Sequence, residues 1–208
     1  MPRFITFEGI EGCGKTTQIQ LLSNAFEENG VDHVLTREPG GTPAGDRIRS
    51  LVLDPATVVG PWCELLLYAA ARAQHLEQVI RPALAAGRLV LCDRFADATR
   101  AYQGFGRGLP LDLIEGLHAL GPLALDPDRT ILIDIDPATA LARAADRDTA
   151  KAVDESRFER EGLAFHERVR QGYLELARRA PGRFAVVDGR GGIAEVQARV
   201  VAALRGVA

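Results

Sequence analysis

A glycine-rich segment near the start of the sequence constrains the fold more than any other feature. Residues 9 to 16, GIEGCGKT, fit the pattern G-x-x-x-x-G-K-[ST] at every fixed position. A short β-prone run, FITF at residues 4 to 7, precedes the segment, and an apolar-periodic stretch from Thr16 to about Glu28 follows it. This order of strand, loop and helix is the context in which the motif forms a phosphate-binding loop.

The residue types in the loop suit the binding of a nucleoside triphosphate. Glycines allow successive backbone N–H groups to converge on one anion at a helix N-terminus, where the helix dipole adds partial positive charge. Lys15 can reach the outer phosphates, and the hydroxyl of Thr16 can ligate Mg²⁺. We expect the phosphates to be bound by Gly9, Ile10, Glu11, Gly12, Cys13, Gly14, Lys15, Thr16 and Thr17.

The pattern of apolar runs predicts an α/β fold. After the first strand and helix, we expect strands at residues 34–36, 89–92, 130–135 and 184–187. Helices are expected at residues 47–53, 64–86, 111–120, after 137, at 158–179 and at 193–204. Short apolar strands separated by helices are typical of a parallel sheet covered on both faces.

We therefore expect one domain, residues 1–208, with the three-layer fold of P-loop NTPases and about five parallel strands. Ligands should bind at the carboxyl ends of the strands. A polar segment at residues 145–156, within a lid of about 143–157, is expected to be a mobile surface segment at that edge.

Composition excludes several classes of protein. A formal charge of -3 and an aromatic content of 6% do not favour a surface that binds nucleic acid. The longest apolar run in the middle of the chain, residues 65–71, is far shorter than the ~20 residues of a membrane span. Cys13, Cys63 and Cys92 form neither an even disulfide framework nor a metal-ligand spacing, so we expect a cytoplasmic protein.

The loop alone does not separate kinases, GTPases and ATPase motors. A GTPase needs Asn/Thr-Lys-x-Asp to recognise guanine, and neither Lys15 nor Lys151 lies in that motif. A motor usually needs a longer chain, so a small kinase fits best. A second signal is Asp93-Arg94 at the end of the third expected strand, where the carboxylate can organise a metal or its waters and the guanidinium can bind a phosphate.

Five ordered motifs resemble those of bacterial thymidylate kinases, which belong to the P-loop nucleoside monophosphate kinases. They are FITFEGIEGCGKTT at 4–17, TREPGGTP at 36–43, YAAARAQH at 68–75, DRF at 93–95 and AYQG at 101–104. The resemblance runs from residue 4 to about residue 200. It implies a homodimer that transfers the γ-phosphate of ATP to dTMP with Mg²⁺, giving dTDP.

The resemblance implies roles for residues around the sugar and the acceptor phosphate. Glu11 would bind the sugar 3′-hydroxyl, and Arg94 would hold the dTMP phosphate. Arg37 and Arg49 match basic residues near that phosphate. Tyr102 would crowd the 2′ position and so select deoxyribose by steric clash.

The resemblance also implies a set of residues around the base. Tyr68 stands where the family has a Phe stacked on thymine, and Pro39 matches a residue near the thymine methyl. Arg72 matches an Arg that hydrogen-bonds the base, and Thr99 and Gln103 face its N3 side.

Positive charge for the transferring phosphoryl group is expected from the lid. Some family members carry an Arg in the loop at the position of Gly12, and this chain does not. We expect Arg143 and Arg147 to supply the charge, with Arg157 as a weaker candidate. Arg143 and Arg190 would also lie near the adenine of ATP. No general base is needed, because a phosphate monoester is largely dianionic at neutral pH.

Two alternatives stay open at this stage. One is a kinase for another nucleotide or nucleoside, and the other is a regulatory module that binds a nucleotide without turnover. An assay of acceptor-dependent ADP release distinguishes these two alternatives from a kinase for dTMP.

Overall fold

The structure is a computed structural model, and it describes residues 3–148, 157–158 and 160–205. Within these residues, five parallel strands form one sheet, as the sequence predicts, and the structure gives their order as β2-β3-β1-β4-β5. The strands are β1 (Phe4–Glu8), β2 (His33–Arg37), β3 (Leu89–Asp93), β4 (Arg129–Asp134) and β5 (Phe184–Asp188).

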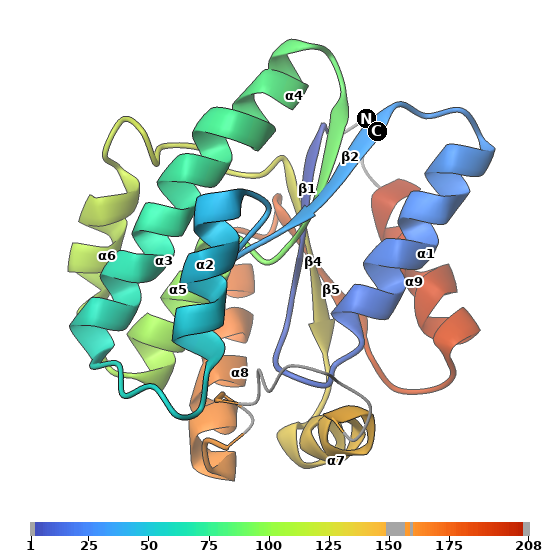
Figure 1. Cartoon of the computed structure of the whole chain (residues 1–208). Helices are drawn as coiled ribbons and strands as arrows, with labels where there is room; N and C mark the ends of the chain where they lie inside the picture. Colours follow the sequence, from blue (N-terminus) through green and yellow to red (C-terminus); the bar gives the residue numbers. More distant parts are fainter. Residues whose placement is uncertain (1–2, 149–156, 159, 206–208) are drawn as a thin grey trace.

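Helices cover both faces of the sheet. α1 and α9 lie together on one face, and α3, α5 and α8 lie on the other (Figure 1). The helices are α1 (Lys15–Glu28), α2 (Pro43–Leu53), α3 (Pro61–His75), α4 (Arg81–Ala85), α5 (Ala96–Thr99), α6 (Leu111–His118), α7 (Pro137–Asp148), α8 (Leu163–Arg179) and α9 (Ile193–Arg205). Two π-helical segments, η1 (Leu76–Ile80) and η2 (Arg100–Gly106), complete the set. Among the described residues, no helix combines the length and the apolar character needed to cross a bilayer.

Several helix boundaries differ from the prediction for local physical reasons. α2 begins at Pro43 rather than residue 47, because the side chain of Thr42 accepts a hydrogen bond from the Gly45 N–H and proline suits the first helical position. α3 begins with another proline, Pro61, and the predicted helix 64–86 is divided among α3, η1 and α4. α8 begins at Leu163 rather than residue 158.

The predicted polar segment 145–156 is partly helical. Its first four residues, 145–148, are the last turn of α7, so the helix predicted after residue 137 extends into this segment. Residues 149–156, the greater part of the predicted lid, lie outside the described residues.

Each strand ends on a charged residue at the same edge of the sheet. β3 pairs with both β1 and β2, and its last residue, Asp93, lies beside Phe7 and Arg37. At the other side of β1, Asp134 of β4 is in register with Asp188 of β5. The apolar strand interiors form the core, so this charged edge is where a ligand can reach polar side chains.

Candidate active site

The phosphate loop turns sharply between β1 and α1. Gly9, Gly12 and Gly14 all have positive φ angles, of 142°, 75° and 96°, which favour glycine. Lys15 begins α1 and is buried, and its Nζ donates a hydrogen bond to the carbonyl oxygen of Ile10 at 3.3 Å. The lysine side chain therefore lies across the loop, as binding of outer phosphates requires.

Gly12 has no room for a side chain. A Cβ atom built on it would overlap the backbone carbonyl of Ala140 in α7. The loop of this chain therefore cannot present an arginine at this position, and the structure explains why the sequence has glycine there.

Thr16 and Asp93 meet beside the loop. The hydroxyl of Thr16 donates a hydrogen bond to Oδ2 of Asp93 at 2.7 Å, although the two residues come from α1 and β3. The pair offers a hydroxyl and a carboxylate, which are the hard oxygen ligands that Mg²⁺ prefers. Among the described residues, no three His, Cys, Asp or Glu side chains cluster as a metal site of their own.

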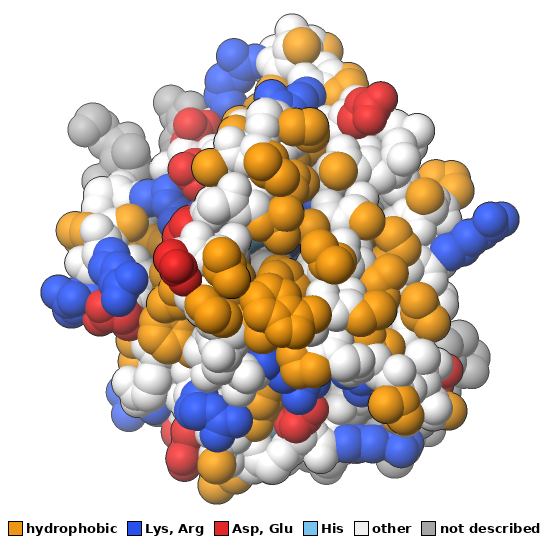
Figure 2. Space-filling view, turned by 90° about the vertical axis from the view of Figure 1, so that its left-hand side faces the viewer, with side chains coloured by type: hydrophobic (Ala, Val, Ile, Leu, Met, Phe, Trp, Pro, Cys, Tyr) orange, Lys and Arg blue, Asp and Glu red, His pale blue; other side chains and the backbone are white. Residues whose placement is uncertain are grey.

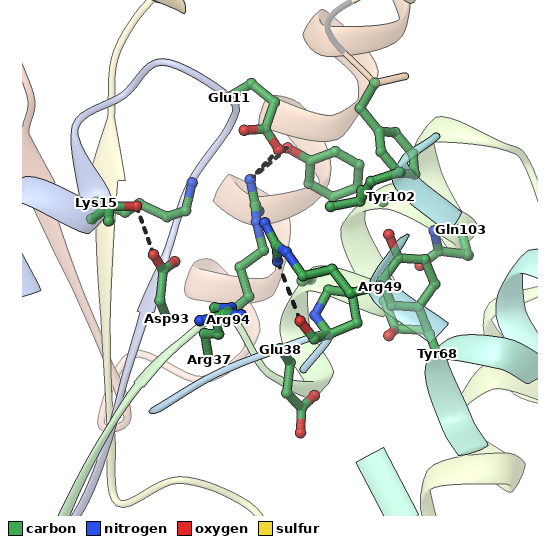
Figure 3. A pocket seen from close by; sticks show the side chains of 16 residues that line it. Glu11, Lys15, Arg37, Glu38, Arg49, Tyr68, Asp93, Arg94, Tyr102 and Gln103 are labelled. Carbon is green, nitrogen blue, oxygen red and sulfur yellow. Dashed lines mark hydrogen bonds and ion pairs between the residues drawn. The ribbon is translucent and has the colours of Figure 1, made fainter. Parts of the chain in front are cut away.

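Arg94 lies in front of the loop and is held on several sides. Its backbone has a φ of 68°, in the left-handed region. Its guanidinium donates to the carbonyl oxygen of Gly9 at 2.9 Å, to Glu11 Oε1 at 2.6 Å, and to the hydroxyls of Tyr102 and Tyr173 at 3.1 Å each. Figure 3 shows Arg94 reaching toward Glu11, with Lys15 and Asp93 to one side and Tyr68 and Gln103 to the other.

Charge pairing keeps Glu11 ionised. Burial raises the pKa of the Glu11 carboxyl, but the positive charges of Arg94 and Lys15 outweigh this effect and lower it to about 2. Glu11 is thus a permanent hydrogen-bond acceptor at the centre of the site.

Glu8, which the sequence analysis did not single out, supports Arg94 from behind. Its fully buried carboxylate accepts the Phe95 N–H at 2.8 Å and the Tyr173 hydroxyl at 2.7 Å. Glu8 therefore holds in place the backbone of Phe95, which follows Arg94, and the hydroxyl of Tyr173, to which Arg94 donates a hydrogen bond. Burial and the charge of Asp97 raise the pKa of Glu8 to about 7, against the lowering effect of Arg94. A charged residue at the end of an otherwise uncharged strand was the available sequence signal.

One pocket collects most of the predicted residues (Figure 3). Twelve predicted residues line it, namely Glu11, Lys15, Thr16, Arg37, Pro39, Arg49, Tyr68, Asp93, Arg94, Thr99, Tyr102 and Gln103. Four residues that were not predicted, Glu38, Leu53, Ala98 and Phe158, complete the lining.

Arg72 does not line this pocket. Its buried guanidinium donates to Glu38 Oε2 at 2.7 Å, to His118 Nε2 at 2.7 Å, to the Phe95 carbonyl at 3.1 Å and to Thr99 Oγ1 at 3.0 Å. Burial and the positive charge of Arg72 lower the pKa of His118 to about 2, so the ring is neutral and can accept. Arg72 thus supports Thr99, and its contact with a base remains a prediction.

A second cleft lies on the other side of the loop. It is lined by Gly12, Cys13, Gly14, Thr17, Gln18, Arg143, Gly189, Gly191, Gly192, Ile193 and Val196. Arg143 donates to the carbonyl oxygen of Gly189 at 3.2 Å, which joins α7 to the loop after β5. Arg190 does not line this cleft, and its side chain instead pairs with Asp188 at 2.8 Å.

The remaining predicted arginines are separated from the pocket or not described in detail. The backbone of Arg147 lies in α7, and its side chain is outside the described part of the structure. Arg157 donates to the carbonyl oxygens of Val52 and Val59 and pairs with Glu64 at 2.7 Å. It is therefore bound to α2 and α3 rather than to the phosphate loop.

Comparison with known proteins gives consistent matches. A family model described as thymidylate kinase matches residues 7–200. The thymidylate kinase of Trichlorobacter lovleyi is 57% identical over 187 residues, covering 89% of this chain and 88% of the relative. The thymidylate kinase of Geobacter sulfurreducens is 56% identical over 204 residues, covering 97% of this chain and 95% of the relative. The crystal structure of thymidylate kinase from Ehrlichia chaffeensis superposes with a TM-score of 0.79 at 36% identity, covering 98% of each chain.

Proposed function

This chain belongs to the thymidylate kinase family, and from that premise we propose how its pocket carries out the family's reaction. The reaction is the ATP-dependent phosphorylation of dTMP to dTDP. The observation that carries the proposal is the position of Arg94, which lines the same pocket as Lys15 and is held there by hydrogen bonds to Gly9 and Glu11 of the phosphate loop. Two phosphate-binding groups in that arrangement allow one phosphoryl group to pass between two nucleotides.

On the donor side, the loop and Lys15 hold the phosphates of ATP. The adenine lies in the second cleft, against the backbone of Gly189, Gly191 and Gly192, with Arg143 beside it. Thr16 and Asp93, which are joined by a hydrogen bond, would hold Mg²⁺. When bound, this ion neutralises charge that develops on the phosphates.

On the acceptor side, Arg94, Arg37 and Arg49 bind the dTMP phosphate, since all three line the pocket. Glu11 accepts a hydrogen bond from the sugar 3′-hydroxyl. Tyr102 is nearly fully buried beside Arg94 and closes the space where a 2′-hydroxyl would lie.

The base occupies the far end of the pocket. Tyr68 stacks on the ring, Pro39 lies beside its methyl group, and Thr99 and Gln103 meet its polar edge. Arg72 contributes through Thr99.

The charge on the transferring group is balanced from outside the loop, because Gly12 leaves no room for an arginine there. We assign this role to Arg147 and Arg143, on a lid that spans about residues 143–157 of the single domain. The acceptor phosphate is its own nucleophile, because it is largely dianionic at neutral pH.

The functional unit is a homodimer. α2, α3 and α6 carry four large exposed apolar side chains, namely Leu51, Trp62, Leu66 and Leu113. Apolar side chains gather on this side of the molecule (Figure 2). An exposed apolar patch of this kind is typical of a protein–protein interface. The free thiols of Cys13, Cys63 and Cys92 support a cytoplasmic location.

A single assay tests the assignment. ADP release from ATP·Mg²⁺ is measured with dTMP, dUMP, dCMP, dGMP and AMP as acceptors, and we expect dTMP to give the highest kcat/KM. Strong preference for another acceptor would overturn the assignment of dTMP. Tight ATP binding without acceptor-dependent ADP release would instead favour the regulatory module.

A further inference from the structure

A buried carboxylate lies directly behind the base end of the pocket. Glu64 of α3 has an exposed fraction of 0%, and it is not among the site residues predicted from the sequence. Its Oε1 accepts a hydrogen bond from Nε2 of Gln103 at 2.8 Å. Arg107 donates to both of its oxygens at 3.3 Å, and Arg157 pairs with Oε2 at 2.7 Å.

These contacts determine which way the amide of Gln103 faces. A carboxylate between two guanidinium groups is only an acceptor, so the group of Gln103 that approaches it must be the NH₂ and not the carbonyl. The amide is planar, and its Oε1 therefore points away from Glu64. Gln103 lines the pocket, and no donor among the described residues is bonded to its Oε1.

Thr99 adds the complementary group. Its hydroxyl oxygen accepts from Nη2 of Arg72 at 3.0 Å, which leaves the hydroxyl proton free to donate into the pocket. The pocket wall thus presents an acceptor at Gln103 and a donor at Thr99. Thymine and uracil match this order with a donor at N3–H and an acceptor at O4. Cytosine presents the inverse order, an acceptor at N3 and a donor at its 4-amino group.

We propose that Glu64 is a specificity-determining positioning residue, which locks the Gln103 amide so that the pocket accepts 4-oxo pyrimidines and rejects 4-amino pyrimidines. The inference rests on the proposed function and adds to it the side chain that determines which hydrogen-bonding group of Gln103 faces the base. If the amide turned over, Nε2 would face the base and would suit the N3 of cytosine. A mismatched buried polar pair discriminates strongly, because both groups lose their hydrogen bonds.

The test compares dTMP with dCMP in the full-length protein. Glu64→Gln replaces the obligatory acceptor with an amide that can accept or donate, so Gln103 can adopt both orientations. We expect the ratio of kcat/KM for dTMP to that for dCMP to fall at least about tenfold. The ratio of the dissociation constant of dCMP to that of dTMP should fall as well. The KM of ATP should not change.

The matched control is Arg107→Gln, which removes one partner of Glu64 but leaves the bond from Gln103 intact. Its dTMP/dCMP ratio should remain within about twofold of the wild type. An equal fall in both variants would show a general loss of packing and would overturn the proposal, as would an unchanged ratio in Glu64→Gln. If Glu64→Gln does not fold, the same ratio is measured in the double variant Glu64→Gln/Arg157→Gln. In this variant the loss of one negative charge is matched by the loss of one positive charge.

The wild type provides a check that needs no variant. N3-methyl-dTMP has no N3–H, so we expect its dissociation constant to be at least about tenfold higher than that of dTMP. Equal binding of the two would overturn the proposal. A wild type that does not prefer dTMP as acceptor would instead contradict the proposed function itself.

Discussion

The hydroxyl of Thr16 and the carboxylate of Asp93 are joined by a hydrogen bond of 2.7 Å, although 77 residues separate them in the sequence. This bond ties the first turn of α1 to the carboxyl end of β3. Both groups offer hard oxygen atoms beside the phosphate loop, and for this reason we propose that they hold Mg²⁺.

Replacing Asp93 by Asn should therefore weaken the metal site. We expect Asp93→Asn to need about 10- to 100-fold more Mg²⁺ for half-maximal rate, because the amide lacks the negative charge that holds the ion or its waters. Initial rates over a range of Mg²⁺ concentrations measure this change, and high Mg²⁺ should restore part of the activity. An unchanged Mg²⁺ dependence with an acid-shifted pH profile would point to proton transfer at Asp93 instead.

Gly12→Ala should destabilise the loop, because the new methyl group would overlap the carbonyl of Ala140 and Gly12 has a positive φ. We expect a loss of more than about 2 kcal/mol in the free energy of unfolding. Urea denaturation measures it. Gly116→Ala is the control, since Gly116 lies in α6 with open space around its Cβ position and helix propensity favours Ala. Equal stability of the two variants would argue against the contact.

Arg147→Ala should slow the chemical step. If Arg147 compensates the charge on the transferring group, kcat should fall by about two decades while the KM of dTMP changes little. Steady-state kinetics at saturating ATP measure both constants. Arg178→Ala removes an exposed arginine that pairs with Glu175 in α8 and should retain wild-type kinetics. An unchanged kcat in Arg147→Ala would exclude this residue as the source of charge.

The pKa of Glu8, raised from 4.5 to about 7, predicts a pH-dependent stability. Between these values the folded protein holds a proton that the unfolded chain has released, so stability falls as pH rises through this window and levels off above it. Glu8→Gln removes this contribution, of up to about 3 kcal/mol.

Urea unfolding at pH 5, 6, 7 and 8 should show a steeper fall for the wild type than for Glu8→Gln. Glu175→Gln is the control, because Arg178 and Arg179 lower the pKa of Glu175 to about 2 and its titration lies below this range. Parallel curves for the wild type and Glu8→Gln would contradict the prediction.

Leu66→Glu should disrupt the proposed homodimer. Leu66 is exposed on α3, and apolar side chains gather on this side of the molecule (Figure 2). A charge there would be buried without a partner on association, so we expect the variant to be a monomer at micromolar concentration. Light scattering coupled to gel filtration measures the mass. Ile193→Glu, at an equally exposed site on α9, should leave the mass unchanged.

The sheet could be predicted from the sequence because its strands are short apolar runs with clear ends. Leu89–Asp93, for example, differs from its predicted range by one residue. Segment 96–106 was missed, since the π-helical turn of η2 does not have the 3.6-residue period by which helices are recognised.

The sequence motifs also predicted most of the residues that line the pocket, but not the buried residues that hold these side chains in place. Glu8 bonds to Tyr173 across 165 residues of sequence, and Glu64 bonds to Gln103 across 39. No local pattern encodes such distant pairs. For the same reason the motif predicted a contact of Arg72 with the base but could not show that its guanidinium is bonded to Glu38, His118 and Thr99.

The close packing of Gly12 on Ala140 also limits how this enzyme can be redesigned. If an arginine outside the loop compensates the charge of the transferring group, as we propose, an engineer could not move that role to the loop by one substitution, because α7 would first have to be displaced. The two arrangements of catalytic charge are therefore separated by a structural barrier, and a change from one to the other requires coordinated substitutions in both segments.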